Sequence, residues 1–169
     1  MTPRYGLTTL AAAALAALLS AASAQTLPSA DRVRGGMFDA SDPAGVARFM
    51  EKTGYRVELA IDTRGDPLIS GRISRTDYAI QFYECENGAF CNSVQFVAQA
   101  AKPAALTLEQ LNAFNARWRY ARLTLADSQV RIQMDVNLDA GVTADNLEDT
   151  LDIWRQLLEI FERDVLKLA

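Results

Sequence analysis

The sequence contains no histidine among its 169 residues. Histidine is the usual base that activates a serine or cysteine nucleophile, and it is a common ligand of zinc and iron. Its absence excludes Ser-His and Cys-His catalytic pairs and histidine-based metal sites. We therefore predict no catalytic residue, no metal site and no cofactor, and we expect that the chain is not an enzyme.

Basic residues are outnumbered as well. The chain has 17 lysines and arginines against 21 aspartates and glutamates, which gives a net charge of −4. An acidic chain without a basic cluster disfavours nucleic acid and anionic lipid as partners. The partner we expect is a protein or a second copy of the same chain.

The longest apolar run lies at the N-terminus. Arg4 precedes an Ala- and Leu-rich stretch at residues 7–19, and Ala22-Ser23-Ala24 has the small-residue pattern of a cleavage site. This order predicts a signal peptide that is cleaved after Ala24. Because the apolar run is short for a bilayer span, stable membrane insertion is not expected after cleavage; an uncleaved anchor is the alternative.

Removal of residues 1–24 predicts a mature protein in the periplasm or outside the cell. Residues 25–41 are polar and have no hydrophobic period, so we expect a flexible leader there. Residues 42–169 have the length of a single domain.

Only two cysteines are present, Cys85 and Cys91. An even pair this close in an exported chain predicts a disulfide. Two predicted strands, Tyr78–Cys85 and Cys91–Ala98, flank the pair, and a hairpin symmetric about Gly88 places the cysteines opposite each other. A redox-active dithiol is the alternative, but the spacing is not C-x-x-C and no basic residue adjoins either thiol.

Hydrophobic periodicity and capping residues predict three helices and six strands in the order α-β-β-β-β-α-β-β-α. The first helix is expected to begin after Asp42 and the third after Thr143. A capping box at Thr107 begins the second helix, which is expected to end at about Tyr120. No strand-helix-strand alternation suggests a parallel sheet. The sequence therefore predicts an α+β domain in which helices pack on a mainly antiparallel sheet.

The last helix has two apolar stripes. The longer one recurs at spacings of three and four and is expected to cover the sheet: Leu147, Leu151, Trp154, Leu158, Phe161, Val165 and Leu168. The shorter one consists of Ile153, Leu157 and Ile160, our candidate partner-binding residues. Two interpretations remain open for it. Either the first helix covers it through Val46, Phe49 and Met50, or it forms a seam with a partner or a second copy.

Two acidic patterns resemble functional sites. Asp135, Asn137 and Asp139 alternate as in a calcium loop, but the EF-hand glycine and bidentate glutamate are missing from their positions. Glu84 and Glu86 could act as paired carboxylates, although such spacing is typical of a solvated surface. A carboxylate-dependent envelope hydrolase and a small-ligand or metal sensor are therefore alternatives to a binding module.

Three segments resemble the bacterial YbjN-like family, whose members are labelled sensory transduction regulators. They are GDPLISGRI at residues 65–73, FYEC at residues 82–85 and MDVNLDAGVTADNLEDTLDIW at residues 134–154. The resemblance covers about residues 42–165 and implies a fold similar to type III secretion chaperones, with no catalytic residues. Together with the export signal, it predicts an exported, non-enzymatic binding or chaperone-like regulatory module that acts through protein–protein contacts.

Overall fold

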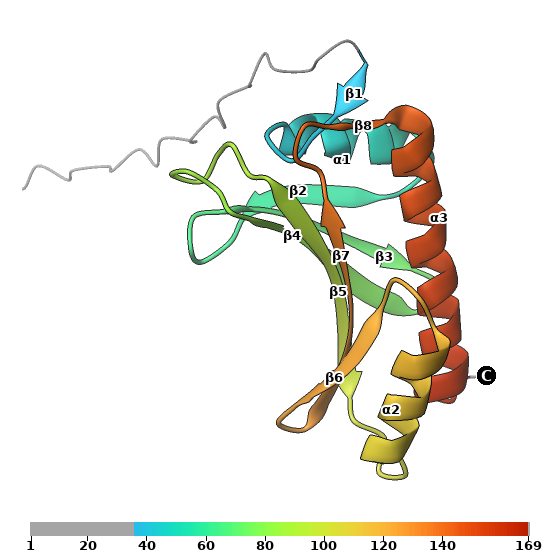
Figure 1. Cartoon of the computed structure of the whole chain (residues 1–169). Coiled ribbons are helices and arrows are strands. Elements are labelled where there is room, and N and C mark those ends of the chain that lie inside the picture. The colour runs from blue at the N-terminus through green and yellow to red at the C-terminus, as the bar shows by residue number, and fades with distance from the viewer. Residues whose placement is uncertain (1–35, 169) are drawn as a thin grey trace, which may run out of the picture.

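The computed structural model of the chain describes residues 36–168. The predicted signal peptide and residues 25–35 of the predicted leader lie outside this part. Six strands form an antiparallel sheet in the order β2-β3-β4-β5-β7-β6, and one long helix crosses it (Figure 1). The predicted α+β class is confirmed.

The elements follow the predicted order, with two short strands added. The sheet contains β2 (Val57–Ile61), β3 (Pro67–Ile73), β4 (Thr76–Tyr83), β5 (Ser93–Ala101), β6 (Arg122–Ala126) and β7 (Gln129–Asn137). The helices are α1 (Pro43–Lys52), α2 (Leu108–Arg117) and α3 (Ala144–Ile160), and α3 continues into a π-helical turn, η1 (Phe161–Val165). The additional strands, β1 (Met37–Phe38) and β8 (Val142–Thr143), pair with each other in a separate two-stranded sheet. Within residues 36–168, no helix is long and apolar enough to span a membrane.

Side-chain caps start the helices at the predicted residues. The Asp42 carboxylate accepts a hydrogen bond from Gly45 N at 2.8 Å. Thr107 forms the predicted capping box with Gln110, and the Thr143 hydroxyl accepts from Asn146 N at 3.2 Å. Each cap satisfies a backbone N–H that the first helical turn leaves without a partner. α2 ends at Arg117, three residues before the predicted end.

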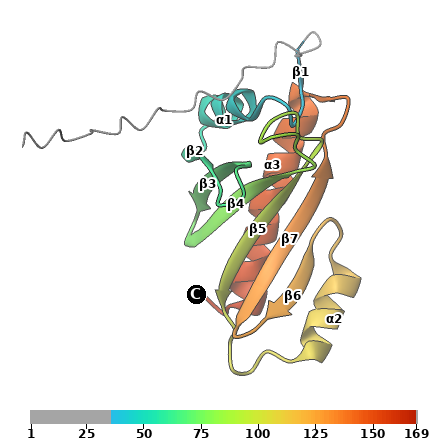
Figure 2. The same ribbon diagram turned by 90° about the vertical axis from the view of Figure 1, so that its left-hand side faces the viewer.

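The inner face of the sheet, the face that α3 covers, holds the core. In Figure 2, α3 lies behind β4, β5 and β7. Trp154 is fully buried, with ring centroids 5.5 Å from Phe96 and 6.2 Å from Tyr78. The long stripe therefore covers the sheet as predicted, except at its last member. Leu168 is 40% exposed because it follows the end of η1.

The opposite, outer face carries amide and charged side chains. Gln133 Nε2 donates to Gln95 Oε1 at 2.9 Å, and Gln95 Nε2 donates to Asp135 Oδ1 at 2.6 Å. Arg131 Nε donates to Gln99 Oε1 at 3.1 Å. Neighbouring strands are thus joined by side-chain hydrogen bonds as well as by the backbone.

The predicted flexible leader, residues 25–41, overlaps the folded domain at its C-terminal end. Met37–Phe38 forms β1, and Ala40 is completely buried. Met37 lies against Gly141, where an added Cβ would stand only 3.2 Å from Met37 Cβ. A strand of two residues is too short to show a hydrophobic period, which explains why the sequence pattern does not reveal it.

Candidate partner-binding surfaces

The shorter stripe of α3 does not form an exposed seam. Leu157, its central residue, is 4% exposed and belongs to the core cluster. Ile153 and Ile160 are half-buried and pack against the same cluster, which also contains Val46 and Met50 of α1. The seam interpretation is therefore corrected: a single chain already covers the stripe, because α3 presents a broad face to the core.

A groove lies between α2 and the C-terminal turn, and we call it the α2 groove. Its volume is about 340 Å³. The floor consists of the buried apolar residues Leu106, Phe114, Leu123 and Val165. The rim carries Gln110, Arg117, Asp164 and Lys167. An apolar centre within a polar rim is the usual anatomy of a protein-docking surface.

The wall of the α2 groove is held by aromatic contacts. Trp118 is half-buried, 6.3 Å from the Phe114 ring, and the Arg117 guanidinium lies 4.8 Å above the Trp118 ring. The hydrogen bond from Arg163 lowers the pKa of Asp164, with smaller contributions from Lys167 and Arg117, so the carboxylate stays ionised. Both signs of charge are therefore fixed along the rim.

Sequence reasoning missed this groove. Phe114 and Trp118 lie four residues apart and read as one apolar side of a helix that packs on the core. α2 ends at Arg117, and Trp118 has an extended backbone. The chain therefore turns away there, and the groove remains open beside η1.

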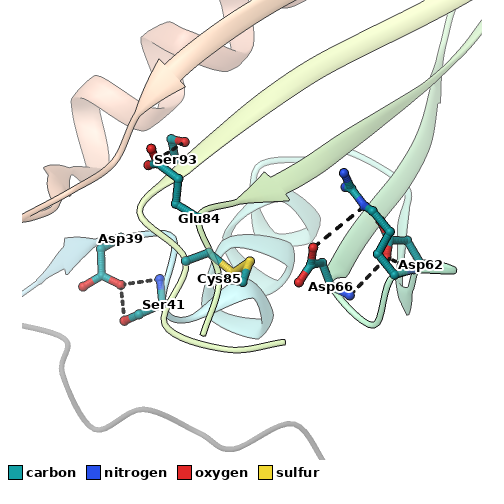
Figure 3. Close-up of a disulfide and its surroundings, with 9 residues drawn as sticks. Asp39, Ser41, Asp62, Asp66, Glu84, Cys85 and Ser93 are labelled. Atoms are coloured by element: carbon teal, nitrogen blue, oxygen red, sulfur yellow. Dashed lines mark hydrogen bonds and ion pairs between the residues drawn. A yellow bond between two sulfur atoms is a disulfide. The ribbon is translucent and has the colours of Figure 1, made fainter. Parts of the chain in front are cut away.

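The Cys85–Cys91 disulfide closes the hairpin between β4 and β5 (Figure 3). The predicted register is also present, with Phe82 opposite Val94. Cys91 is buried, at 3% exposure, and Cys85 is half-buried. The disulfide therefore has a structural role: it joins the end of β4 to the start of β5 at this end of the sheet.

The hairpin tip packs against the turn between β2 and β3. An added Cβ at Gly88 would stand 2.4 Å from Gly65 O, so only glycine fits there. Arg64 lies over the Tyr83 ring at 5.3 Å and also pairs with Asp62 of its own turn. In Figure 3, Asp62 and Asp66 of the β2–β3 turn lie on one side of Cys85, and Asp39 and Ser41 lie on the other.

The predicted acidic candidates are engaged in structural contacts. Asp135 forms an ion pair with Arg122, and Asn137 Oδ1 accepts from Asp139 N at 2.9 Å. Burial raises the pKa of Asp135, but hydrogen bonds from Arg122 and Gln95 outweigh it and leave the pKa lowered. Among residues 36–168, no group of three or more His, Cys, Asp or Glu side chains is placed to hold a metal ion.

The two hairpin glutamates lie on the surface. Glu84 and Glu86 are both exposed, and Glu84 accepts a hydrogen bond of 3.4 Å from the Ser93 hydroxyl. Exposed carboxylates at this spacing are typical of a solvated surface. These residues therefore have the surroundings of surface carboxylates.

Glu162 is a buried carboxylate that the sequence pattern did not single out. It is 6% exposed and accepts hydrogen bonds from Thr76 Oγ1 at 2.6 Å, Ser74 Oγ at 2.9 Å and Arg75 N at 3.0 Å. Burial raises the pKa of Glu162, but these hydrogen bonds outweigh it and leave the pKa lowered. The residue ties η1 to the turn between β3 and β4.

The fold resembles that of a chain in a crystallised protein complex. The crystal structure of the ExsC-ExsE complex contains a chain with 18% sequence identity and a TM-score of 0.50. The match covers 70% of this chain and 88% of that one. The predicted likeness to type III secretion chaperones is confirmed at the level of the fold. No curated protein matches the chain in sequence.

The family is established by sequence. Residues 42–167 match the YbjN family, described as "Putative bacterial sensory transduction regulator". This chain belongs to the YbjN family. The match begins at the N-cap of α1 and ends after η1, so it includes the whole six-stranded sheet and all three helices.

Proposed function

We propose that this chain is an exported, non-enzymatic binding module, chaperone-like or regulatory, that acts through protein–protein contacts. The α2 groove is the observation that carries this function, because its apolar floor and charged rim suit a protein side chain better than a reacting substrate. The family description and the fold of a chain from a protein complex support the same class of function.

The size of the groove defines what it would hold. A volume of about 340 Å³ lies at the lower end of the range for small-molecule sites and accommodates one or two large apolar side chains. Arg117 and Lys167 would face acidic groups of the partner, and Asp164 a basic one. The proposed partner is therefore a protein segment with an apolar anchor flanked by charges.

One substitution on α2 can test this assignment. Ala113 lines the groove and is exposed, so Ala113→Arg would fill the groove without removing a core side chain. Ala116 is also exposed on α2 but does not line the groove, and Ala116→Arg is the matched control. We expect the wild-type chain and the control to retain a stoichiometric protein during purification from envelope extract, and Ala113→Arg to lose it.

The same purification distinguishes the alternatives. A bound small molecule or metal ion in place of a protein would support a sensor. Turnover that disappears when Glu84 or Glu86 is replaced by glutamine would support an envelope hydrolase. Retention of the same protein by the Ala113→Arg variant would show that binding does not use the α2 groove.

Export is part of the proposal. It is supported by the order of charge, apolar run and small residues at residues 1–24, and by the disulfide, because such bridges persist in oxidising compartments. We expect protein from the envelope fraction to have the mass of a chain that begins at Gln25. A retained N-terminal segment, or a purely cytoplasmic location, would contradict export.

A further inference from the structure

The two edges of the sheet differ in how their backbone groups are satisfied. At β6, the side-chain amide of Asn115 accepts from Leu123 N at 2.7 Å and donates to Leu123 O at 3.1 Å. α2 thus closes this edge, beside which it lies in Figure 2. At the opposite edge, β2 pairs with β3 alone among the strands of residues 36–168. An edge of this kind is a template for another strand.

The turn after β2 determines which backbone groups face outward. Asp62 N donates to Asp66 O at 2.8 Å, so Asp62 bonds across the pair. Bonded and non-bonded residues alternate in an antiparallel ladder, which turns Glu58 and Ala60 toward β3 as well. The N–H and C=O groups of Val57, Leu59 and Ile61 therefore point away from the sheet. Within residues 36–168, no hydrogen bond from another element reaches these outward groups.

We propose that β2 pairs antiparallel with β2 of a second copy, about a two-fold axis at Leu59, and so joins the two sheets into one. This inference uses a different surface from the α2 groove and does not rest on the proposed function. A two-fold axis makes the strand pair with itself, so the sequence of β2 must be complementary to its own reverse.

Several registers would align the outward backbone groups of the two β2 strands, and the charged side chains favour one of them. An axis at Glu58 would place Glu58 against Glu58 of the second copy, and an axis at Ala60 would place Glu58 against Asp62. An axis at Val57 or Ile61 would leave much of the strand unpaired. The axis at Leu59 pairs all five residues, sets Glu58 opposite Ala60 and brings Arg56 opposite Asp62. Like charges directly opposite destabilise a strand pair, whereas opposite charges stabilise it.

The apolar side chains fit the same register. Val57 and Leu59 are half-buried, Ile61 is 42% exposed, and all three lie on one face of β2. The axis at Leu59 places the two Leu59 side chains together and each Val57 beside an Ile61. The exposed part of Ile61 would thereby gain an apolar neighbour. Because a five-residue strand pair buries less area than a standard stable interface, the dimer should be weak and dependent on concentration.

Ala60 provides a matched pair of tests. It is exposed on the outer face and would stand opposite Glu58 of the second copy, twice in each dimer. Ala60→Lys creates two opposite-charge pairs and should tighten the dimer about fivefold, and Ala60→Glu should weaken it by a similar factor. Sedimentation equilibrium at low salt on the processed chain recovered from cells would measure both constants. Circular dichroism would confirm that each variant is folded.

Two further measurements test the register itself. Adding Glu58→Lys to Ala60→Glu restores opposite charges across the axis and should recover the dimer. In hydrogen exchange, the amides of Val57, Leu59 and Ile61 should become protected as protein concentration rises, whereas those of Glu58 and Ala60 should be protected throughout.

Several results would overturn the proposal. One is a chain that stays monomeric across the whole concentration range. Another is a dimer whose affinity shifts in the same direction for Ala60→Lys and Ala60→Glu. A dimer abolished by Ala113→Arg would assign self-association to the α2 groove. Protection of the Leu59 amide by a different protein, and not by a second copy, would assign the edge to that protein.

Discussion

The two faces of the sheet are built from the same strands but are stabilised in different ways. On β5, Phe96 faces inward and is 2% exposed, while its neighbour Gln95 faces outward and bonds to Gln133 and Asp135. On β7, Met134 is buried, while Gln133 on the outer side is only half-buried. Alternation along each strand thus separates apolar packing from amide hydrogen bonding.

This difference indicates where binding can evolve without loss of the fold. The inner face is occupied by α3, and the free energy of unfolding depends on its packing. The outer face is wet, so each of its hydrogen bonds replaces one to water and contributes little. The proposed contact surfaces, the α2 groove and the edge of β2, lie at the borders of the sheet, where neither face has to be opened.

The largest effect is expected at the centre of the inner face. Trp154→Ala removes a fully buried ring that lies against Phe96 and Tyr78, and it should lower the free energy of unfolding by about 3–5 kcal/mol. Urea unfolding followed by circular dichroism would measure the loss. A change below about 1 kcal/mol would contradict the assignment of α3 as the main cover of the sheet.

Trp154→Phe is the matched control. The indole Nε1 is buried with no hydrogen-bond partner among the described residues, so removing this N–H leaves no protein group unpaired. Phenylalanine keeps an aromatic ring against Phe96. The loss should therefore be smaller than for alanine, and an equal loss would show that the indole N–H has a partner in solution.

The second largest effect on the free energy of unfolding is expected at the buried carboxylate of Glu162, at the border of the inner face. Glu162→Ala leaves the hydroxyls of Ser74 and Thr76 and the amide of Arg75 without their acceptor, and it should lower the free energy of unfolding by about 1.5–3 kcal/mol at pH 7. Chemical unfolding of the two proteins at one pH would measure the difference.

The pH dependence of the same residue has a defined sign. Because the pKa of Glu162 is lowered in the folded chain, its stabilisation is complete above the pKa of an unperturbed glutamate, about 4.5, and is lost as pH falls through the folded pKa. The wild-type chain should thus lose more stability than Glu162→Gln between neutral and acidic pH. Parallel pH profiles for the two proteins would contradict this contribution.

The third effect lies at the hairpin end. Reduction of the Cys85–Cys91 disulfide opens a short loop and should lower stability by about 2 kcal/mol in the chain-entropy model. The fold should survive, because the β4–β5 pairing and the contact of Gly88 with Gly65 do not depend on the bridge. Thermal unfolding with and without reductant would measure the loss. Complete unfolding on reduction would be inconsistent with this magnitude.

Much of the fold could be predicted from the sequence, because periodicity and caps act locally. Asp42, Thr107 and Thr143 cap the helices where the pattern places them, and the hairpin register follows from symmetry about Gly88. The buried state of Leu157 could not be predicted in the same way. A stripe on a helix shows which side is apolar, but the breadth of the surface that meets it depends on tertiary packing.

The binding surfaces were the least predictable part. The α2 groove requires residues of α2 and the loop before it together with residues of η1. Residues 118–160 separate these two parts in the sequence, and the two parts carry no shared pattern. Asn115 shows the same limit, because an exposed asparagine on a helix gives no sign that its amide closes the edge of β6. Such contacts become visible only once the strand order is known.

The smallest effect is expected on the outer face, and it gives the sharpest test of the comparison. Gln95→Ala removes hydrogen bonds to Gln133 and Asp135, whose remaining polar groups stay accessible to water. The free energy of unfolding should therefore change by no more than about 0.5 kcal/mol, within the usual range for surface substitutions. Val94→Ala on the buried side of the same strand is the matched control and should cost several times more. Equal losses at Gln95 and Val94 would mean that the amide network supports the fold as strongly as the core does, and the two faces would then share one role.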